Sequence, residues 1–469
     1  MAFKYQQLTT QLVAQLQSGY WQPGEKLPSV RRLCTLYHCS LATVQHALQQ
    51  LEAMGWLQAV DRSGYYVQRP ATTGAARPPT ALPSVLAAPT DVTVPALFYD
   101  VMQRSAAFDF YPAGPLVALP QLAQLHRLQR RVMRELGTVA ALRYDEPRGA
   151  LPLREQLALH YQAMGLALQP DELCLTAGCQ HALFLALKAS CQPGDIVAVE
   201  QPGFYGVLQL LEQLQLRALE IPLGAHGMDM AVLERALRQW PIKACVVTPA
   251  FATPTGVCLS PAAKLQLLAL AEQHDFAIIE DDIYGDLGFV ERPTPVKALD
   301  TTGRVLLCGS FSKALSRDVR VGWIAAGRYQ AQVERLKLVT QLAGSQTHEL
   351  ALAQFMAQGH YRRHLQHFRQ RLQHQHHQLQ QLLQQLFAKQ PQVRWSEPSG
   401  GLALWLELVP HIDTVQLYAE ALSHGVVLTP GAMFSQAGSF GHCLRLSFSN
   451  PVLGPRAQAL QWLAAKLTA

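Results

Sequence analysis

Charged residues are few in this sequence, and long hydrophobic runs are missing. Charged residues make up 15% of the 469 positions and hydrophobic residues 49%, a balance that excludes a disordered chain and allows a large core. No stretch reaches the roughly eighteen apolar residues of a membrane span, and no basic segment precedes an apolar one near the start. We therefore expect a soluble, cytoplasmic protein without a membrane partner.

Cysteine is present but shows no pattern. The nine cysteines are scattered and form no C-x-x-C pair. An odd, dispersed set argues against a disulfide framework and against a zinc site, and it fits a reducing compartment.

A proline-rich segment divides the chain. Residues 70–95 read PATTGAARPPTALPSVLAAPTDVTVP and show neither helical nor strand periodicity, which is typical of a linker. The length predicts several domains. We expect a small helical domain at 1–69, the linker at 70–95, a large domain with an N-terminal arm at 96–335, and a smaller α+β domain at 336–469.

The first 69 residues have the element order of a winged helix-turn-helix. Leu8, Leu12 and Leu16 share one helical face, and Ser29 and Ser40 are placed to cap two further helices. Two short strand patterns, 56–60 and 65–67, flank a turn and predict a β-hairpin. We expect the start of the third helix to present polar side chains to a DNA groove.

The charge balance of this segment agrees with that expectation. The whole chain has a formal net charge of +6; residues 1–69 alone hold six basic and three acidic residues, a net of +3. Such an excess on a small domain is typical of polyanion binding.

Residues 27–67, LPSVRRLCTLYHCSLATVQHALQQLEAMGWLQAVDRSGYYV, resemble the GntR-type DNA-binding domain, with its Leu-Pro-Ser-x-Arg start, a Thr-Val pair on the recognition helix and a glycine-containing wing. Leu41 stands where many relatives have a basic residue, which leaves the base preference open. The resemblance implies a double-stranded DNA operator as partner, contacted by Ser29, Arg31, Ser40, Thr43, Gln45, Arg62 and Gly64.

Beyond residue 140, short apolar runs alternate with helical patterns. Continuous apolar runs separated by helices predict a mainly parallel sheet that is covered on both faces. Ligands of such sheets lie beyond the carboxyl ends of the strands. The expected strands are Leu173–Thr176, Ile196–Val199, Ala244–Val247, Phe276–Ile279 and Val305–Cys308.

The unusual residues follow three of these strands. Gly178 opens a helix, Asp281 comes soon after another strand, and Lys313 stands beside two serines with Arg320 seven residues later. Pyridoxal phosphate needs an amine for its Schiff base, a carboxylate for its ring nitrogen, and a helix N-terminus with a guanidinium for its phosphate. The set therefore predicts a pyridoxal-phosphate site.

Residues 105–469 resemble the fold-type I aminotransferases through TAGCQHAL, EQPGFYG, TPTG, EDDIYG, SFSK, RVGW, PGAMF and LRLSFS, in family order. The resemblance implies that Lys313 forms the Schiff base and is the catalytic residue, and that Arg445 binds a substrate or effector carboxylate. It assigns Asp281 to the ring nitrogen, Tyr284 to the ring hydroxyl, and Phe204 or Tyr205 to stacking on the ring. It assigns phosphate binding to Gly178, Cys179, Gln180, Ser310, Ser312 and Arg320.

One motif departs from the family pattern. Thr253 replaces the asparagine of Asn-Pro-x-Gly, which normally donates to the ring oxygen; the threonine hydroxyl could still donate. Because that bond helps to set the pKa of the Schiff base, we expect the protein to bind the cofactor but to catalyse transamination weakly or only as a vestige. The fused arrangement resembles the MocR subfamily of GntR-type regulators.

Three functions remain open. The first is a homodimeric transcriptional regulator that senses pyridoxal phosphate or a small amino compound. The second is a working aminotransferase to which the DNA-binding domain at 1–69, called the head below, is appended. The third is a degenerate aminotransferase-like region, the body at 96–469, that serves only for dimerisation. The intact DNA-binding domain favours the first over the second, and the intact Lys313, Asp281 and Arg320 favour the first two over the third.

Residues 360–386 are rich in histidine and glutamine. His360, His364 and His367 could suggest a metal site, but an apolar stripe through Leu365, Leu372 and Leu379 predicts a packing helix instead. We interpret the histidines as its solvated side and expect no metal.

Overall fold

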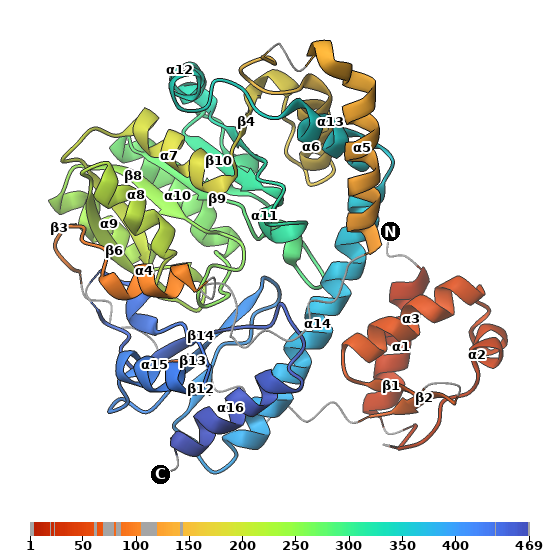
Figure 1. Cartoon of the computed structure of the whole chain (residues 1–469). Coiled ribbons are helices and arrows are strands. Elements are labelled where there is room, and N and C mark those ends of the chain that lie inside the picture. The colour runs from red at the N-terminus through yellow and green to blue at the C-terminus, as the bar shows by residue number, and fades with distance from the viewer. Residues whose placement is uncertain are drawn as a thin grey trace.

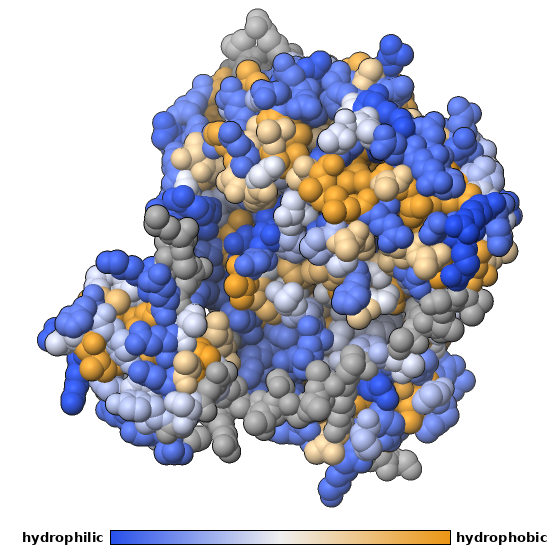
Figure 2. Space-filling view, turned by 180° about the vertical axis from the view of Figure 1, so that it is seen from behind, coloured by the Kyte–Doolittle hydropathy of each residue, from blue (hydrophilic) through white to orange (hydrophobic). Residues whose placement is uncertain are grey.

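The computed structural model describes residues 4–18, 20–22, 24–60, 63–68, 79–80, 86–104, 120–140, 144–436 and 438–467. The small N-terminal head and the larger body are both visible in Figure 1, and the view from behind shows the head as a lobe beside the body (Figure 2). Arg62 and residues 70–78 and 81–85 of the expected linker lie outside the described residues.

The head has the predicted winged helix-turn-helix architecture. Its helices are α1 (Lys4–Gln17), α2 (Val30–Tyr37) and α3 (Leu41–Ala53), and the antiparallel strands β1 (Leu57–Val60) and β2 (Gly64–Val67) form the wing. Leu8, Leu12 and Leu16 are buried, as their spacing predicts, in a core with residues of α2 and α3.

The body is built on one large sheet with the order β3-β6-β5-β8-β9-β10-β11-β4. The five strands expected from apolar runs are all present, as β4 (Leu173–Thr176), β5 (Ile196–Gln201), β8 (Ile242–Val247), β9 (Ala277–Asp281) and β10 (Val305–Ser310). Neighbouring strands from β6 to β10 run parallel. The fold-class prediction is therefore confirmed.

Four strands of the large sheet were missed. β6 (Arg217–Gly224) carries Arg217, Glu220 and Pro222 among its apolar residues; β7 (Gly227–Met228) pairs with it, and β11 (Gly322–Ala325) lies antiparallel between β10 and β4. β3 (Thr90–Asp91) pairs with β6, although it falls in the expected linker. A two-residue strand is too short to show periodicity, so only its pairing reveals it.

Helices cover both faces of the sheet (Figure 1). One face packs against α7 (Cys179–Ser190), α8 (Tyr205–Gln213) and α12 (Gln330–Thr340). The opposite face packs against α9 (Met230–Gln239) and α10 (Pro261–His274). Burial on both sides explains why the central strands are almost wholly apolar.

A third, larger core joins the rest of the body. It includes residues of α4 (Ala96–Gln103), α5 (Pro120–Ala140), α6 (Leu151–Gln162), α13 (Gln346–Ala357), α14 (His360–Leu386), α15 (Thr414–Ser423) and α16 (Pro455–Lys466). A small antiparallel sheet, β12 (Arg394–Trp395), β13 (Ala403–Glu407) and β14 (Cys443–Ser447), belongs to it. No helix within the described residues is long and apolar enough to cross a membrane.

Candidate functional site

A cavity of about 310 Å³ opens beside β9 and the loops after β5 and β10. Lys313, Arg317 and Arg320 contribute positive charge to its lining, and Asp281 contributes a carboxylate. Of the predicted cofactor residues, the cavity brings together Cys179, Gln180, Phe204, Tyr205, Asp281, Ser312, Lys313 and Arg320.

The N-terminus of α7 forms one wall of an anion cradle. Gly178 caps this helix with φ 89° and ψ 173°, a conformation that only glycine adopts readily. A Cβ at this position would lie 2.6 Å from Nη2 of Arg320. The absence of a side chain therefore lets the guanidinium lie directly beside the free N–H groups of the helix, where a phosphate would bind.

Arg320 is held in place from two sides. Its Nη1 donates to Oγ of Ser312 at 2.9 Å, and its Nη2 donates to the carbonyl of Ala177 at 3.3 Å. Ser310, the last residue of β10, accepts from the backbone N–H of Ser312 at 3.0 Å and starts the short helix α11 (Phe311–Ala314). Hydroxyls, guanidinium and Lys313 thus converge because a strand ends and a helix begins there.

Asp281 is the last residue of β9 and is buried. Its Oδ1 accepts from Sγ of Cys179 at 3.2 Å and from the backbone N–H of Ile283 at 3.3 Å. Burial raises the pKa of Asp281 to about 6. A buried carboxylate with a raised proton affinity is suited to share the proton of a pyridine nitrogen.

Tyr284, Thr253 and Arg445 do not line the cavity but form a second cluster. Nε of Arg445 donates to Oγ1 of Thr253 at 3.2 Å, and Thr253 also hydrogen bonds with Tyr284. All three side chains are buried. The Thr253 hydroxyl is thus engaged with Arg445 and Tyr284 rather than exposed to the cavity.

Tyr205 lies between the large cavity and the cluster of Tyr284, Thr253 and Arg445. It lines the cavity, and the positive charges of Arg445 and Arg317 act on its hydroxyl, whose pKa is raised by burial. Phe204 lines the same cavity and also a second, much smaller one.

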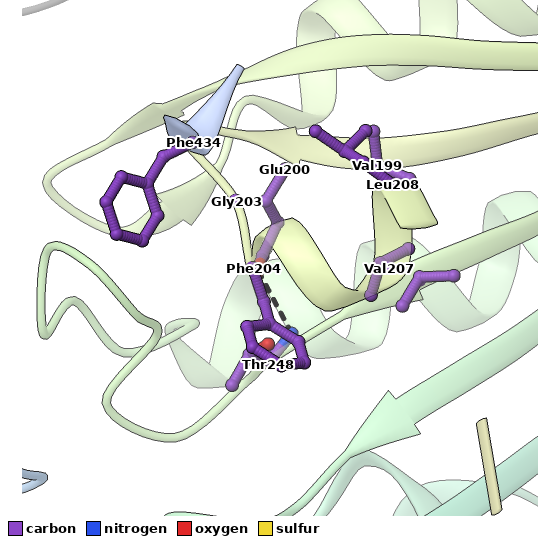
Figure 3. A pocket seen from close by; sticks show the side chains of 9 residues that line it. Val199, Glu200, Gly203, Phe204, Val207, Leu208, Thr248 and Phe434 are labelled. Carbon is purple, nitrogen blue, oxygen red and sulfur yellow. Dashed lines mark hydrogen bonds between the residues drawn. The ribbon is translucent and has the colours of Figure 1, made fainter. Parts of the chain in front are cut away.

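Figure 3 shows this small cavity, which Phe204, Glu200 and Thr248 line together. Oε2 of Glu200 accepts from the backbone N–H of Thr248 at 3.2 Å. Because the carboxyl is buried among apolar side chains, its pKa is raised to about 8. The cavity has room for about 10 Å³ of solvent, so it is a packing defect beside the site and holds no cofactor.

The N-termini of α2 and α3 in the head begin with capping serines, and the polar side chains near them face solvent. Ser40 caps α3 by accepting from the backbone N–H of Thr43 at 3.2 Å, and Ser29 caps α2 by accepting from that of Arg32 at 3.3 Å. Arg31 and Gln45 are exposed, as DNA contacts must be.

Two more exposed residues of the head lie near the residues that are expected to contact DNA. Leu41, at the position that departs from the family pattern, is 51% exposed. Lys26 is exposed and lies against Gly64 of the wing. It was not among the predicted DNA contacts, although a cation near a wing is a signal of phosphate binding.

Comparison with known proteins decides the family. The model of "Aminotransferase class I and II" matches residues 120–453, and that of "Bacterial regulatory proteins, gntR family" matches residues 4–67. This chain belongs to the GntR-type transcriptional regulators that have a class I and II aminotransferase body. The predicted family is confirmed.

Relatives share this two-part regulator architecture over nearly their full length. The chain is 37% identical to the uncharacterized HTH-type transcriptional regulator YdcR of Escherichia coli K12, over 95% of this chain and 94% of that protein. It is 36% identical to YjiR of the same organism, over 98% and 97%. The regulator therefore has a DNA-binding head, and DNA is its partner.

Solved aminotransferases share the fold of the regulator's body. The kynurenine aminotransferase of Pyrococcus horikoshii aligns with a TM-score of 0.71 at 26% identity and covers 80% of this chain and 95% of its own. LysN, the alpha-aminoadipate aminotransferase of Thermus thermophilus, gives the same values.

Sequence reasoning about the regulator missed several cavity residues. Arg317 lies on the loop between Lys313 and Arg320, and Gln209 and Met102 come from α8 and α4. Arg317 had a signal, a cation between two assigned residues. Gln209 and Met102 had none, because a polar or apolar residue on a helix is ordinary.

The reading of the α14 histidines was wrong for His364. It is fully buried rather than solvated, and its Nε2 lies 2.7 Å from the carbonyl of Ala314. Burial lowers the pKa of His364. Its Nε2 is the donor in this contact, because a carbonyl oxygen can only accept. Within the described part of the chain, no group of three or more potential ligands could hold a metal ion.

Proposed function

We propose that this protein is a homodimeric transcriptional regulator whose body binds pyridoxal phosphate and responds to it, or to a small amino compound, by changing how its heads bind an operator. The observation that carries the proposal is the joint lining of one cavity by Lys313, Asp281 and Arg320, in a chain whose head presents an exposed DNA-binding face. The domain boundaries we propose remain those expected from the sequence.

The residues present fit this cofactor. Gly178 leaves the space in which Arg320 meets the start of α7, so the phosphate would be held by backbone N–H groups, Arg320 and the hydroxyls of Ser310 and Ser312. Cys179 and Gln180 follow on the same helix start. When bound, the cofactor supplies an electrophilic aldehyde and an electron-withdrawing ring.

Each remaining residue has a separate task. Lys313 lines the cavity and would supply the amine for the Schiff base, and Asp281 would hold a proton at the ring nitrogen. Phe204 and Tyr205 line the cavity and would cover the ring face. Tyr284 lies outside the cavity lining, and we propose it as the partner of the ring hydroxyl. Arg445, held by Thr253, would bind the carboxylate of an effector.

Regulation is favoured over catalysis by the Thr253 cluster. The hydroxyl that replaces the family's asparagine is engaged with Arg445 and Tyr284. We therefore expect transamination to be weak or vestigial. The alternative, an aminotransferase with an appended head, is supported by retention of Lys313 and Asp281 and predicts steady turnover of amino and keto acids.

One experiment separates these functions. The purified protein is mixed with pyridoxal phosphate and its absorbance is recorded before and after addition of a panel of amines and amino acids. A bound-cofactor band that shifts with some amines but gives no steady turnover supports the regulator. Multiple turnover supports the enzyme, and a missing band refutes both and leaves the body as a dimerisation platform.

The DNA side of the proposal is tested separately. A two-fold dimer carries two heads and would read paired half-sites. An operator selected from random duplexes is titrated at zero and saturating pyridoxal phosphate, and linkage requires operator and cofactor to change each other's affinity equally. Identical operator affinity and half-site spacing in both conditions, for every amine tried, would refute regulation by the body.

A further inference from the structure

Helix α14 (His360–Leu386) lies between the cofactor cavity and the DNA-binding head. Its 27 residues span about 40 Å at 1.5 Å per residue, and Figure 1 shows it running along the body with the head beside it. One side of the helix contacts the Lys313 segment, and another side contacts α3, the recognition helix of the head.

The inner side of α14 holds the turn that carries Lys313. Nε2 of His364 donates to the carbonyl of Ala314, the residue after Lys313, at 2.7 Å. One helical turn earlier, the ring of Tyr361 meets the ring of Phe311 edge to face, with centroids 5.4 Å apart. Both ends of the four-residue helix α11 (Phe311–Ala314) therefore rest on α14.

Helix α14 is also tied to the segment after Asp281. The hydroxyl of Tyr361 donates to Oδ2 of Asp286 at 2.8 Å, and Nε of Arg369 donates to the carbonyl of Asp286 at 2.6 Å. Arg292 bridges the carboxylates of Asp286 and Asp282. Asp282 follows Asp281 directly, so both cofactor-facing segments are fastened to one helix.

The outer side of α14 contacts the head. Nε2 of Gln366 lies 2.8 Å from Nε2 of His46 on α3. At the end of α3, Gly55 lies so close to His377 that a Cβ there would be 2.1 Å from its Nε2. Gln366 and His377 are eleven residues apart and so share a face, whereas His364 is about 200° around the helix from Gln366.

The contact leaves the DNA-binding start of α3 open. Gln45 and Leu41 remain exposed while the neighbouring His46 meets α14. Movement of α14 would therefore shift the orientation of the recognition helix without covering it.

We propose that His364 is a positioning residue for the Lys313 turn and that α14 couples cofactor occupancy to the head through Gln366 and His377. The inference rests on the proposed function, since it assumes that pyridoxal phosphate binds at Lys313. A ligand shifts such an element only by favouring one of its positions. Cofactor binding at Lys313 would favour one position of α14, because His364 of this helix holds the carbonyl of Ala314, the residue after Lys313.

The test uses the full-length protein and pyridoxal phosphate as the probe. Hydrogen–deuterium exchange of the amides of α3 (Leu41–Ala53) is compared with and without the cofactor, and cofactor binding is followed by absorbance. In the wild type we expect the exchange of α3 to change about fivefold or more, the lower end of typical coupling between sites.

Two kinds of variant test the coupling: one removes the contacts of α14 with the head, and the other removes its hydrogen bond to the Lys313 turn. The double variant Gln366→Ala/His377→Ala should keep wild-type cofactor affinity but lose the cofactor-induced change in α3. His364→Leu should lose that change and also bind the cofactor about fivefold more weakly, as expected for one lost hydrogen bond. His364→Gln retains an N–H donor and should restore both properties in part. Gln385→Ala, at an exposed position near the end of α14, is the matched control and should behave as wild type.

The outcomes distinguish the two proposals. If the wild type shows no bound-cofactor band, the proposed function fails and the coupling fails with it. If the band is normal but the exchange of α3 does not respond, only the coupling is overturned. A response that survives in the Gln366→Ala/His377→Ala variant also overturns it. Because Gln366 is exposed and His377 is only partly buried, this variant leaves the core of the body unchanged, and the test does not depend on the folding of His364→Leu.

Discussion

Replacing Gly178 by alanine should separate the cofactor cradle from general backbone strain. The new methyl group would lie 2.6 Å from Nη2 of Arg320, and the guanidinium can escape only by leaving Ser312 and the carbonyl of Ala177. Loss of one charge-assisted hydrogen bond to the phosphate costs about 1.5–3 kcal/mol. We therefore expect pyridoxal phosphate to bind about 10- to 150-fold more weakly.

The same substitution also strains the backbone. Gly178 has φ 89°, and a side chain in such a conformation costs about 1–3 kcal/mol of stability. Gly194→Ala is the matched control, because Gly194 has φ 90° but no other atom within 4 Å of its added methyl group. It should lose similar stability and keep its cofactor affinity.

The assay combines absorbance titration with pyridoxal phosphate and urea unfolding of the cofactor-free proteins. The reasoning predicts that both alanine variants unfold at lower urea, and that only Gly178→Ala binds weakly. Equal cofactor affinity in wild type and Gly178→Ala would refute the assignment of this cradle to the phosphate. A similar affinity loss in Gly194→Ala would show that strain alone explains the effect.

Three further predictions concern the amine, the head and a buried carboxyl. Lys313→Ala should abolish the bound-cofactor absorbance while circular dichroism shows a folded protein; a borohydride-reducible chromophore in the variant would contradict the role of Lys313. Arg31→Ala should weaken operator binding and lower its salt slope by about one unit for one lost phosphate contact, with cofactor content unchanged; an unaltered slope would mean that Arg31 does not contact DNA. Burial raises the folded-state pKa of Glu200 to about 8 from 4.5, so unfolding releases a proton and stability falls as pH rises from about 4.5 to 8. Glu200→Gln should therefore match wild type near pH 4.5 and be more stable at pH 8 by a few kcal/mol, at about 1.4 kcal/mol per pKa unit, in urea unfolding without cofactor; no gain at pH 8 would show that the carboxyl is hydrated.

Much of the fold could be predicted because its signals are local. The spacing of Leu8, Leu12 and Leu16 predicts an amphipathic helix whatever lies around it, and five apolar runs predict the buried central strands. β6 was missed because polar residues interrupt it, and β3 because two residues carry no period. Their pairing is a property of the sheet rather than of the segment.

The candidate site divides in the same way. Asp281 and Lys313 were found because each comes just after an apolar run that predicts a strand, and the carboxyl ends of neighbouring parallel strands meet at one edge of a sheet. Arg320 was found from its place seven residues after Lys313. The cavity brings these three together. Arg317, Gln209 and the contact between Arg445 and Thr253 required the coordinates, since they depend on how distant segments pack.

Local patterns along the chain are enough to predict the two-part organisation, the class of each part and the residue types that a pyridoxal-phosphate site requires. These follow from hydrophobic period, capping residues and motif chemistry, all of which act within a few residues along the chain. Which surface each side of α14 meets depends instead on the packing of the folded chain. His364 and Gln366 are two residues apart and equally polar, yet one is buried against the Lys313 turn and the other meets the head. Their roles differ because the surfaces on either side of the helix come from segments far away in the sequence.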